Sequence, residues 1–254
     1  TRKNIPVRYK QAYLRIAWAD QRPHALMMIF TLVKRFVGID SGDIPYPIQT
    51  FAALMPWVFF QDATSEGIES VVKNASLVRK IYFPREIFPL TAVTTKLVEF
   101  CISAFILAGL MVWYQMLPTV YIFWVPLIIL YTLLVSLTIA LIGSAINVSY
   151  RDIGAALPII LSLLMYASPV IYPLSLVREK LIVQQAAGEW SDLFYTIYTL
   201  NPLAGIIDSF QNVVLRGLPP DLGSMLPGLI LTAILLPLSY RYFKWEEAYF
   251  ADVI

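Results

Sequence analysis

The feature that most constrains this chain is a run of 51 residues, 100–150, that contains no Asp, Glu, Lys, Arg or His. A membrane-spanning helix needs about 20 apolar residues, so this run is too long for one span and long enough for two. The only plausible turn within it lies at residues 115–118, which include Pro118. The run therefore predicts two apolar helices, over about 87–113 and 120–147.

The composition of the whole chain agrees with a membrane protein. Hydrophobic residues make up 58% of the 254 residues and charged residues 14%, whereas a soluble domain carries about 25% charged residues. This balance excludes a water-soluble enzyme. We predict an all-α integral membrane protein with a single transmembrane domain, 1–254. Its six transmembrane helices are expected at about 18–37, 48–72, 87–113, 120–147, 154–172 and 223–243.

The basic residues set the orientation of these spans. With the N-terminus in the cytoplasm, the inner segments hold twelve Lys and Arg residues and the outer loops only Arg178, Lys180 and Arg216. Basic residues are enriched in cytoplasmic loops. Because the number of spans is even, both termini are expected in the cytoplasm.

The N-terminal segment, 1–17, has the pattern of an amphipathic helix. Tyr9 lies on its apolar face, while Arg8, Gln11 and Arg15 share the opposite face. Such a helix lies in the membrane surface. It is either a basic anchor or a contact for a cytoplasmic partner.

A second segment that does not span, 74–84, lies between the second and third spans. Asn74 or Ser76 can cap a helix there, and Pro84 must end it. About two turns fit, which is too short for a helix that is stable alone in water. Its apolar side chains, including Leu77 and Val78, must therefore dock either on the chain's own bundle or on another subunit.

The third such segment is the external region 173–222. Asn201 as N-cap, Pro202 at the first helical position and Gly217 past the end form a complete start and stop signal for one helix. Residues 193–200 before it are too few to cross a bilayer. This pattern predicts a pair of half-inserted helices at the outer surface, which is tolerated only beside protein or a water-filled cavity.

Groups for catalysis are scarce in the sequence. One histidine cannot form a His-ligated metal cluster, and no G-x-S-x-G, Cys-x-x-Cys or G-x-x-x-x-G-K-[ST] motif occurs. The chain therefore cannot hydrolyse ATP by a P-loop mechanism and is not expected to be an enzyme by itself. Energy for transport must come from a partner or from an ion gradient.

Two sets of side chains have both a structural and a functional interpretation. Asp62, Glu66, Glu69 and Lys73 form a stripe on one helix face, which is either a proton path or a structural stripe with Glu69 paired to Lys73. Lys96 and Glu99 are expected to neutralise one another. Five aromatic residues are either ordinary interfacial residues or the lining of a sugar conduit: Trp57, Phe59, Phe60, Tyr166 and Tyr172.

Several motifs along nearly the whole chain, in the right order, resemble the membrane permease of bacterial polysaccharide ABC exporters. These type-2 ABC permeases export O-antigen, capsular polysaccharide or teichoic acid. The motifs are Pro45-Tyr-Pro47, Pro56-Trp57-x-Phe59-Phe60, Asn74-Ala-Ser-Leu-Val-x-Lys80-Ile-Tyr-Phe-Pro-Arg85, Asn147-Val-x-Tyr150-Arg-Asp152, Ser168-Pro-Val-Ile-Tyr-Pro173, Asn201-Pro202 and Phe250-Ala-Asp-Val-Ile254.

The resemblance implies a homodimer of the permease with two copies of a cytoplasmic ABC ATPase subunit, which binds ATP and Mg; the chain itself holds no cofactor or metal. The cargo would be a lipid-linked polysaccharide that crosses the bacterial inner membrane through an aromatic-lined channel. Membrane lipids would surround the complex, and no nucleic acid is expected to bind. Residues 1–17 would be an interface helix and 193–216 outer gate helices with Asn201, Pro202 and Phe210. The coupling helix seated in the ATPase would comprise Asn74, Ser76, Leu77, Val78, Arg79, Lys80, Ile81, Tyr82 and Phe83.

Two other classes compete with this interpretation. A stand-alone ion-coupled lipid or drug transporter would use Asp62, Glu66 and Glu69 as a proton relay. A membrane glycosyltransferase or acyltransferase is disfavoured by the single histidine and the lack of a recognisable acidic metal site. An ATPase that co-purifies at one-to-one stoichiometry would separate all three.

Overall fold

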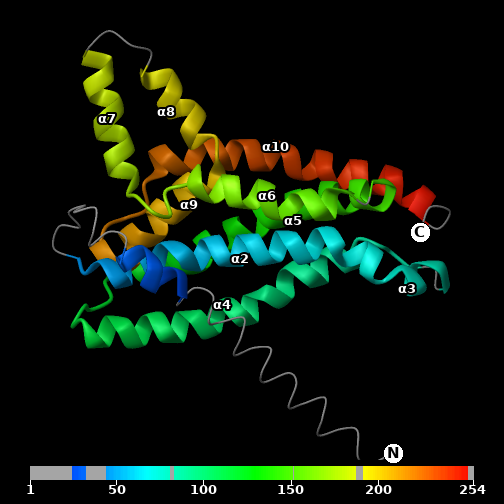
Figure 1. The fold of residues 1–254 in the computed structure, drawn as a ribbon, viewed down its shortest axis with the longest axis horizontal. Coiled ribbons are helices and arrows are strands. Elements are labelled where there is room, and N and C mark those ends of the chain that lie inside the picture. The colour runs from blue at the N-terminus through cyan, green and yellow to red at the C-terminus, as the bar shows by residue number, and fades with distance from the viewer. Residues whose placement is uncertain (1–24, 33–43, 81–82, 151, 187–190, 251–254) are drawn as a thin grey trace, which may run out of the picture.

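The computed structural model describes residues 25–32, 44–80, 83–150, 152–186 and 191–250, and the regular elements among them are all helices (Figure 1). This confirms the predicted all-α class. The longer helices are α2 (Tyr46–Lys73), α4 (Ile87–Trp113), α5 (Val125–Ser149), α6 (Asp152–Tyr166) and α10 (Leu222–Glu246). The shorter elements are α3 (Ala75–Lys80), η1 (Val120–Trp124), α7 (Leu174–Ala186), α8 (Ser191–Thr199), α9 (Pro202–Gln211), η2 (Asn212–Arg216) and η3 (Glu247–Tyr249).

Helix α2 forms the centre of the bundle and packs against both α4 and α5. The approach to α5 depends on two glycines. A Cβ on Gly67 would lie 2.5 Å from Cβ of Ala140, and one on Gly143 would lie 2.5 Å from Cγ1 of Ile68. Small residues at such contacts allow two helices in a membrane to pack with their backbones close together.

Three segments of the described chain are long and apolar enough to cross a membrane: Ile87–Trp113, Val120–Ser149 and Leu222–Tyr249. They match three of the predicted spans. Helix α2 covers the predicted span 48–72, and α6 ends at Tyr166, because residues 167–170 form a turn instead of continuing to 172. Of the predicted first span, only residues 25–32 are described, and they are helical. The number of six spans stays a prediction.

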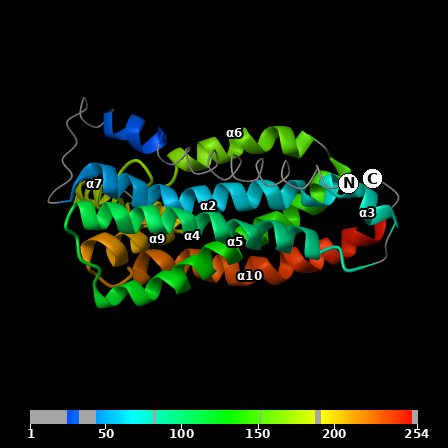
Figure 2. The same ribbon diagram turned by 90° about the horizontal axis from the view of Figure 1, so that it is seen from below.

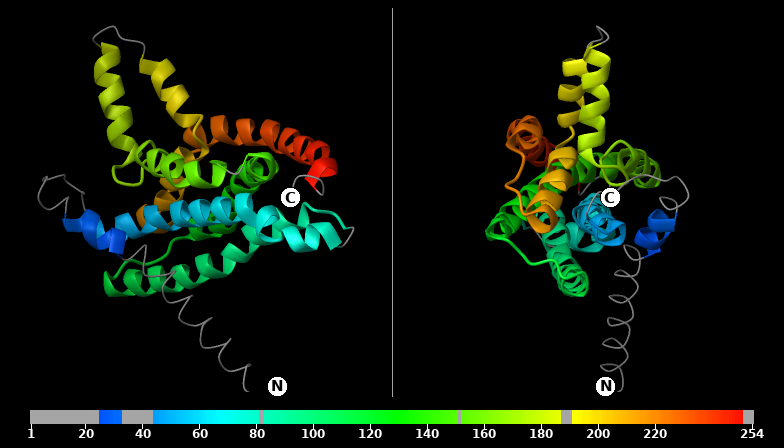
Figure 3. Two further views of the ribbon diagram at one scale, coloured as in Figure 1. Left: turned by 45° about the vertical axis from the view of Figure 1, so that its right-hand side comes forward. Right: turned by 90° about the vertical axis from the view of Figure 1, so that its left-hand side faces the viewer.

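The bundle is elongated, and its two ends carry different elements. Helices α2, α4, α5 and α10 run along the long axis (Figure 2). Helix α3 and the C-terminal end of α10 lie at one end, which we call the inner end, and α9 lies at the other, the outer end (Figure 1). Helices α7 and α8 pack on one another and project sideways from the outer end (Figure 3). The sequence analysis had not predicted α7 as a helix.

Candidate functional sites at the two ends of the bundle

Helix α3 follows α2 directly, with Asn74 as the one residue between them. The side-chain amide of Asn74 donates to the Ser70 carbonyl at 2.7 Å, so it closes α2, while its backbone carbonyl accepts from Leu77 and Val78 and begins α3. On α3, Val78 is buried, whereas Leu77 is 42% exposed and Ser76 and Arg79 are also exposed. One side of the helix is thus docked on its own bundle and the other side is open.

The docked side of α3 belongs to a second hydrophobic cluster, separate from the main core. Val78 packs there with Val71 of α2, with Phe243 of α10 and with Phe250. The rings of Phe243 and Phe250 meet edge to face, with centroids 5.4 Å apart. Phe250, in the motif near the C-terminus, is only 1% exposed. The cluster therefore joins α3 to segments far away in the sequence.

Four charged residues surround this cluster, and we call them the inner clamp: Arg85, Glu86, Lys244 and Glu247. The Arg85 backbone N–H donates to Oε1 of Glu247 at 2.9 Å, and the Arg85 guanidinium donates to the Glu247 carbonyl. Lys244 Nζ lies 3.0 Å from Oε2 of Glu86 and 2.6 Å from Oε2 of Glu247. The clamp ties the loop after α3 to the end of α10.

The charge of Glu86 is favoured by these contacts. Its partial burial on its own raises the pKa of the carboxyl, but a backbone hydrogen bond and the Lys244 ammonium outweigh that effect and hold the pKa below its usual value. Tyr240 also donates a hydrogen bond to Oε1 of Glu86, at 3.4 Å. These contacts therefore favour the charged form of Glu86.

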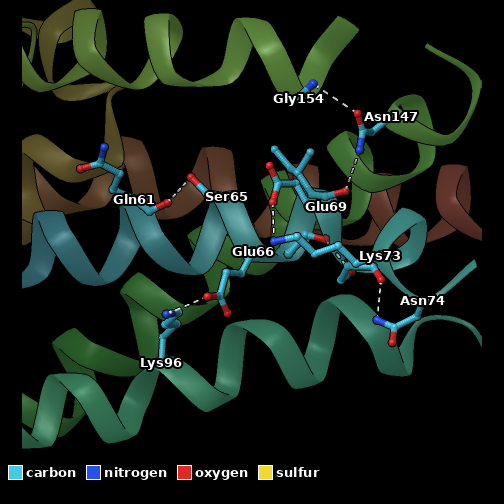
Figure 4. A network of polar contacts seen from close by, with 12 residues as sticks. Gln61, Ser65, Glu66, Glu69, Lys73, Asn74, Lys96, Asn147 and Gly154 are labelled. Carbon is cyan, nitrogen blue, oxygen red and sulfur yellow. Dashed lines mark hydrogen bonds and ion pairs between the residues drawn. The ribbon is translucent and has the colours of Figure 1, made fainter. Parts of the chain in front are cut away.

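Two carboxylates of the stripe on α2, Glu66 and Glu69, are paired with lysines (Figure 4). Glu69 and Lys73 form the predicted i,i+4 ion pair, with a distance of 2.6 Å. Lys96 of α4 is only 7% exposed and contacts both Glu99, at 2.8 Å, and Glu66, at 3.0 Å. The pair with Glu99 was predicted, but the pair between helices with Glu66 was not. Spacing along one helix could not show it, because it depends on how α2 and α4 pack.

Asn147, within one of the quoted motifs, connects three helices (Figure 4). Its side-chain amide donates to the Ile68 carbonyl of α2 at 3.3 Å, and its Oδ1 accepts from the Gly154 N–H of α6 at 3.2 Å. The second bond satisfies an N–H in the first turn of α6, where no intrahelical acceptor exists. Asn147 therefore fixes the start of α6 against α2.

At the outer end, the predicted helix signal is confirmed. Oδ1 of Asn201 accepts from the Leu203 N–H at 3.2 Å, Pro202 is the first residue of α9, and Gly217 has a φ of 63° after η2. Phe210 is buried and its ring lies edge-on to Phe100 of α4, with centroids 6.1 Å apart.

The polar face of this segment is buried as well. Asp208 is 6% exposed; it accepts from the Asn212 amide at 2.9 Å and lies 3.6 Å from Nη1 of Arg216. Burial raises the pKa of the Asp208 carboxyl, and the Arg216 guanidinium opposes this only in part. The π-helical turn of η2 carries Asn212 and Arg216. Such turns are frequent at functional sites.

Helix α9 packs on α10 with almost no space between the two backbones. A Cβ on Gly205 would lie 2.6 Å from the Ser224 carbonyl oxygen, and a Cβ on Gly228 would lie 2.6 Å from Cα of Pro202. Both clashes are with backbone, which cannot move aside as a side chain can. Gly205 and Gly228 therefore allow close contact between α9 and α10.

The five aromatic candidates fall into two groups. Trp57, Phe59 and Phe60 lie in the main core, and Trp57 is 0% exposed with its Nε1 donating to Oε1 of Gln61 at 3.1 Å. Tyr166 is 65% exposed. Tyr172 donates to the Tyr166 carbonyl at 3.0 Å and accepts from the hydroxyl of Tyr198 of α8 at 3.3 Å.

For two predicted elements, the interface helix and the coupling helix, some or all of the residues lie outside the part of the chain that the structure describes. The interface-helix residues Arg8, Tyr9, Gln11 and Arg15 lie outside the described residues, as do Ile81 and Tyr82 of the predicted coupling helix. Within the described part of the chain, no group of three or more His, Cys, Asp or Glu side chains could hold a metal ion.

An all-helical bundle with three helices of membrane length and an exposed helix at one end defines a class, the multispan helical membrane proteins. Comparison with known proteins narrows the class. The family model described as ABC-2 type transporter matches residues 1–215, and the chain belongs to this family, which consists of transporter permeases.

Named relatives align over most of their length. The chain is 25% identical over 253 residues to the O-antigen export system permease protein RfbA of Myxococcus xanthus, covering 99% of this chain and 92% of the relative. It is 29% identical over 252 residues to RfbA of Klebsiella pneumoniae, covering 95% and 91%. It is 23% identical over 221 residues to the polysialic acid transport protein KpsM of Escherichia coli, covering 85% and 79%.

Proposed function

We propose that this chain is the permease half of an ATP-driven exporter that moves a lipid-linked polysaccharide out of the cytoplasm. One observation carries the proposal. Helix α3 is anchored to its own bundle through Val78 and presents Ser76, Leu77 and Arg79 to solvent, which is the geometry that a docking element for a second subunit requires. The printed functions of the relatives, O-antigen export and polysialic acid transport, give the class of cargo.

The proposed assembly has two copies of this chain and two copies of a cytoplasmic ATPase subunit, which binds ATP and Mg. The chain holds six spans and no cofactor, lies in the bacterial inner membrane and has both termini in the cytoplasm. The channel lies at the interface between the two copies. Residues 74–83 form the coupling helix, 1–17 the interface helix and the α8–α9 region the outer gate.

The aromatic groups have different roles in this proposal. Tyr166 and Tyr172 are the channel-lining candidates that the structure favours, because the Tyr166 ring is exposed on the single chain and Tyr172 lies next to it. Trp57, Phe59 and Phe60 are packed inside the chain, so they support the wall of the channel unless the helices separate.

The coupling role is tested with Leu77→Asp. A charge on this exposed leucine opposes burial in a groove of the ATPase but leaves the fold of the chain intact. We expect loss of ATPase co-purification and of surface polysaccharide, with normal membrane insertion. Leu218→Asp is the matched control, because Leu218 is also an exposed leucine, 51% against 42% for Leu77, and lies next to η2 instead of on α3.

Unimpaired export by the Leu77→Asp variant would contradict the coupling role. A transport assay on the purified chain separates the proposed function from ion-coupled transport. A purified chain that transports in a proton gradient without an ATPase would instead support the carboxylate stripe on α2 as a relay. The ion pairs of Glu66 and Glu69 with lysines argue against that role.

A further inference from the structure

The loop that leaves α3 is attached to α10 by several independent contacts. Arg85 and Glu247, 162 residues apart in sequence, share two hydrogen bonds, and the Arg85 guanidinium also lies over the Phe250 ring, 6.0 Å from its centroid. Lys244 bridges Glu86 and Glu247. A rotation or translation of this loop therefore acts directly on the C-terminal end of α10.

Helix α3 itself contacts the same end of α10 through apolar side chains. Val78 shares a cluster with Phe243 and Phe250, both of which are almost fully buried. The inner clamp and this cluster lie side by side, so α3 and its exit loop are joined to α10 by both charged and apolar contacts.

The opposite end of α10 is joined to the gate helix by backbone contact. Gly205 of α9 lies against Ser224, and Gly228 of α10 lies against Pro202. Because no flexible side chain separates these backbones, α9 cannot stay in place when this end of α10 moves.

Between these two attachments α10 is one continuous helix. Its 25 residues give a length of about 37 Å at 1.5 Å per residue, which extends from the gate to the inner clamp (Figure 2). Pro227 and Pro237 each remove a backbone hydrogen bond, but α5 packs along α10 and supports it.

We infer that α10 is a rigid link that transmits a displacement of α3 to the outer gate helix α9. Lys244 and Glu247 are positioning residues at the inner end of α10. The inference rests on the proposed function, since it assigns α3 and α9 to coupling and gating.

A second route from α3 to α9 exists and must be separated from this one. Helix α2 is continuous with α3 at Asn74, and the Gln211 amide of α9 donates to the Gln49 carbonyl of α2 at 3.0 Å. Because α3 is joined to α2 through Asn74 and contacts α10 through Val78, a displacement of α3 can move α10 relative to α2. A pocket of about 440 Å³ lies between the loop after α3 and the end of α10, and it leaves room for that loop to shift against α10; its lining is Phe83, Pro84, Arg85, Lys244, Glu247 and Ala248.

The test breaks the inner clamp without touching α2. In cells, Lys244→Ala and Glu247→Ala are each expected to lower surface polysaccharide, measured by periodate oxidation and hydrazide labelling, by about fivefold, the effect of ~1 kcal/mol of coupling free energy. ATP hydrolysis by the purified complex and complex yield are expected to persist. Lys244→Arg keeps the ion pairs and is expected to restore export.

The matched control is Lys73→Ala, which removes an exposed ion pair at the same end but off the path to α10. A second readout uses the purified chain alone: Lys244→Ala is expected to speed amide hydrogen exchange in α9, at the far end of the molecule, and Lys73→Ala is not.

The inferred role of α10 would be overturned if Lys244→Ala and Glu247→Ala both exported at the wild-type level and Lys244→Ala left hydrogen exchange in α9 unchanged. In that case α2 would be the route from α3 to α9. If the wild-type complex showed no ATP-dependent export, the proposed function would fail instead. In that case the hydrogen-exchange result would still decide whether α10 links the two ends.

Discussion

The inner and outer parts of this bundle are stabilised by different interactions. Besides the close packing of α2 on α5 at Gly67 and Gly143, the inner half contains two ion pairs that join separate segments, Lys96 with Glu66 and Lys244 with Glu86, and these charges are partly exposed. The outer end relies on backbone contact at Gly205 and Gly228 and on the buried face of α9. Ion pairs tolerate a change of geometry better than close backbone packing does. The inner half is thus suited to adjustable contacts with a moving partner, and the outer end to movement of α9 and α10 as one body.

The largest effect is expected from Lys96→Met in the inner half. The variant leaves the carboxylates of Glu66 and Glu99, which are 33% and 34% exposed, without their shared cation, and we expect a cost of about 3–4 kcal/mol of unfolding free energy. Unfolding with SDS in mixed micelles measures it. Lys73→Met, which removes an exposed pair with Glu69, is expected to cost below about 0.5 kcal/mol. Equal losses would show that burial does not distinguish the two pairs.

Trp57→Ala tests packing in the main core. Removing a side chain that is fully buried leaves a cavity, and we expect a loss of about 3 kcal/mol together with low yield. Tyr166→Ala removes an exposed ring and is expected to keep stability within about 0.5 kcal/mol while lowering polysaccharide flux. If Trp57→Ala lowered flux at full stability, Trp57 would belong to the channel lining after all.

Gly205→Ala tests the close contact of α9 with α10. The new Cβ would clash with the Ser224 carbonyl oxygen, 2.6 Å away, so we expect a loss of about 2 kcal/mol and reduced export. Gly109→Ala, on α4, is the control because no atom lies within 4 Å of its added Cβ. If Gly205→Ala left stability and export unchanged, the contact between α9 and α10 would adjust as readily as the ion pairs of the inner half.

The smallest expected effect is on the pH dependence of stability, through the buried carboxyl of Asp208 at the outer end. Because burial raises the pKa of Asp208, the folded chain binds this proton more readily than the unfolded chain does. Its contribution to stability is fully present below the ordinary pKa of 3.8 and is lost as the pH rises through the folded-state value.

The midpoint temperature of thermal unfolding in detergent, measured from below pH 3.8 upward, is expected to depend less on pH for Asp208→Asn than for the wild type. The charged groups near Asp208 are Arg216 and Asp221, so Asp221→Asn serves as the comparison. An identical pH profile for Asp208→Asn and the wild type would exclude Asp208 as the source.

Much of the architecture could be predicted from local sequence. Uncharged length predicted α4 and α5, and Asn201, Pro202 and Gly217 predicted the limits of the segment formed by α9 and η2, because these signals act through nearby backbone atoms. The sequence missed α7, whose mixed composition has no clear apolar face. It also missed the side chains of the inner clamp as a group.

The sequence by itself determined that this chain belongs in a membrane, where its three helices of membrane length lie and which family it resembles. Only the tertiary structure decided which distant residues meet: Glu66 with Lys96, Arg85 with Glu247, and Gly205 with Ser224. The physical reason is range. Hydrophobic length and helix capping depend on neighbouring residues, whereas ion pairs and backbone contacts between helices depend on the rotation and register with which whole helices pack.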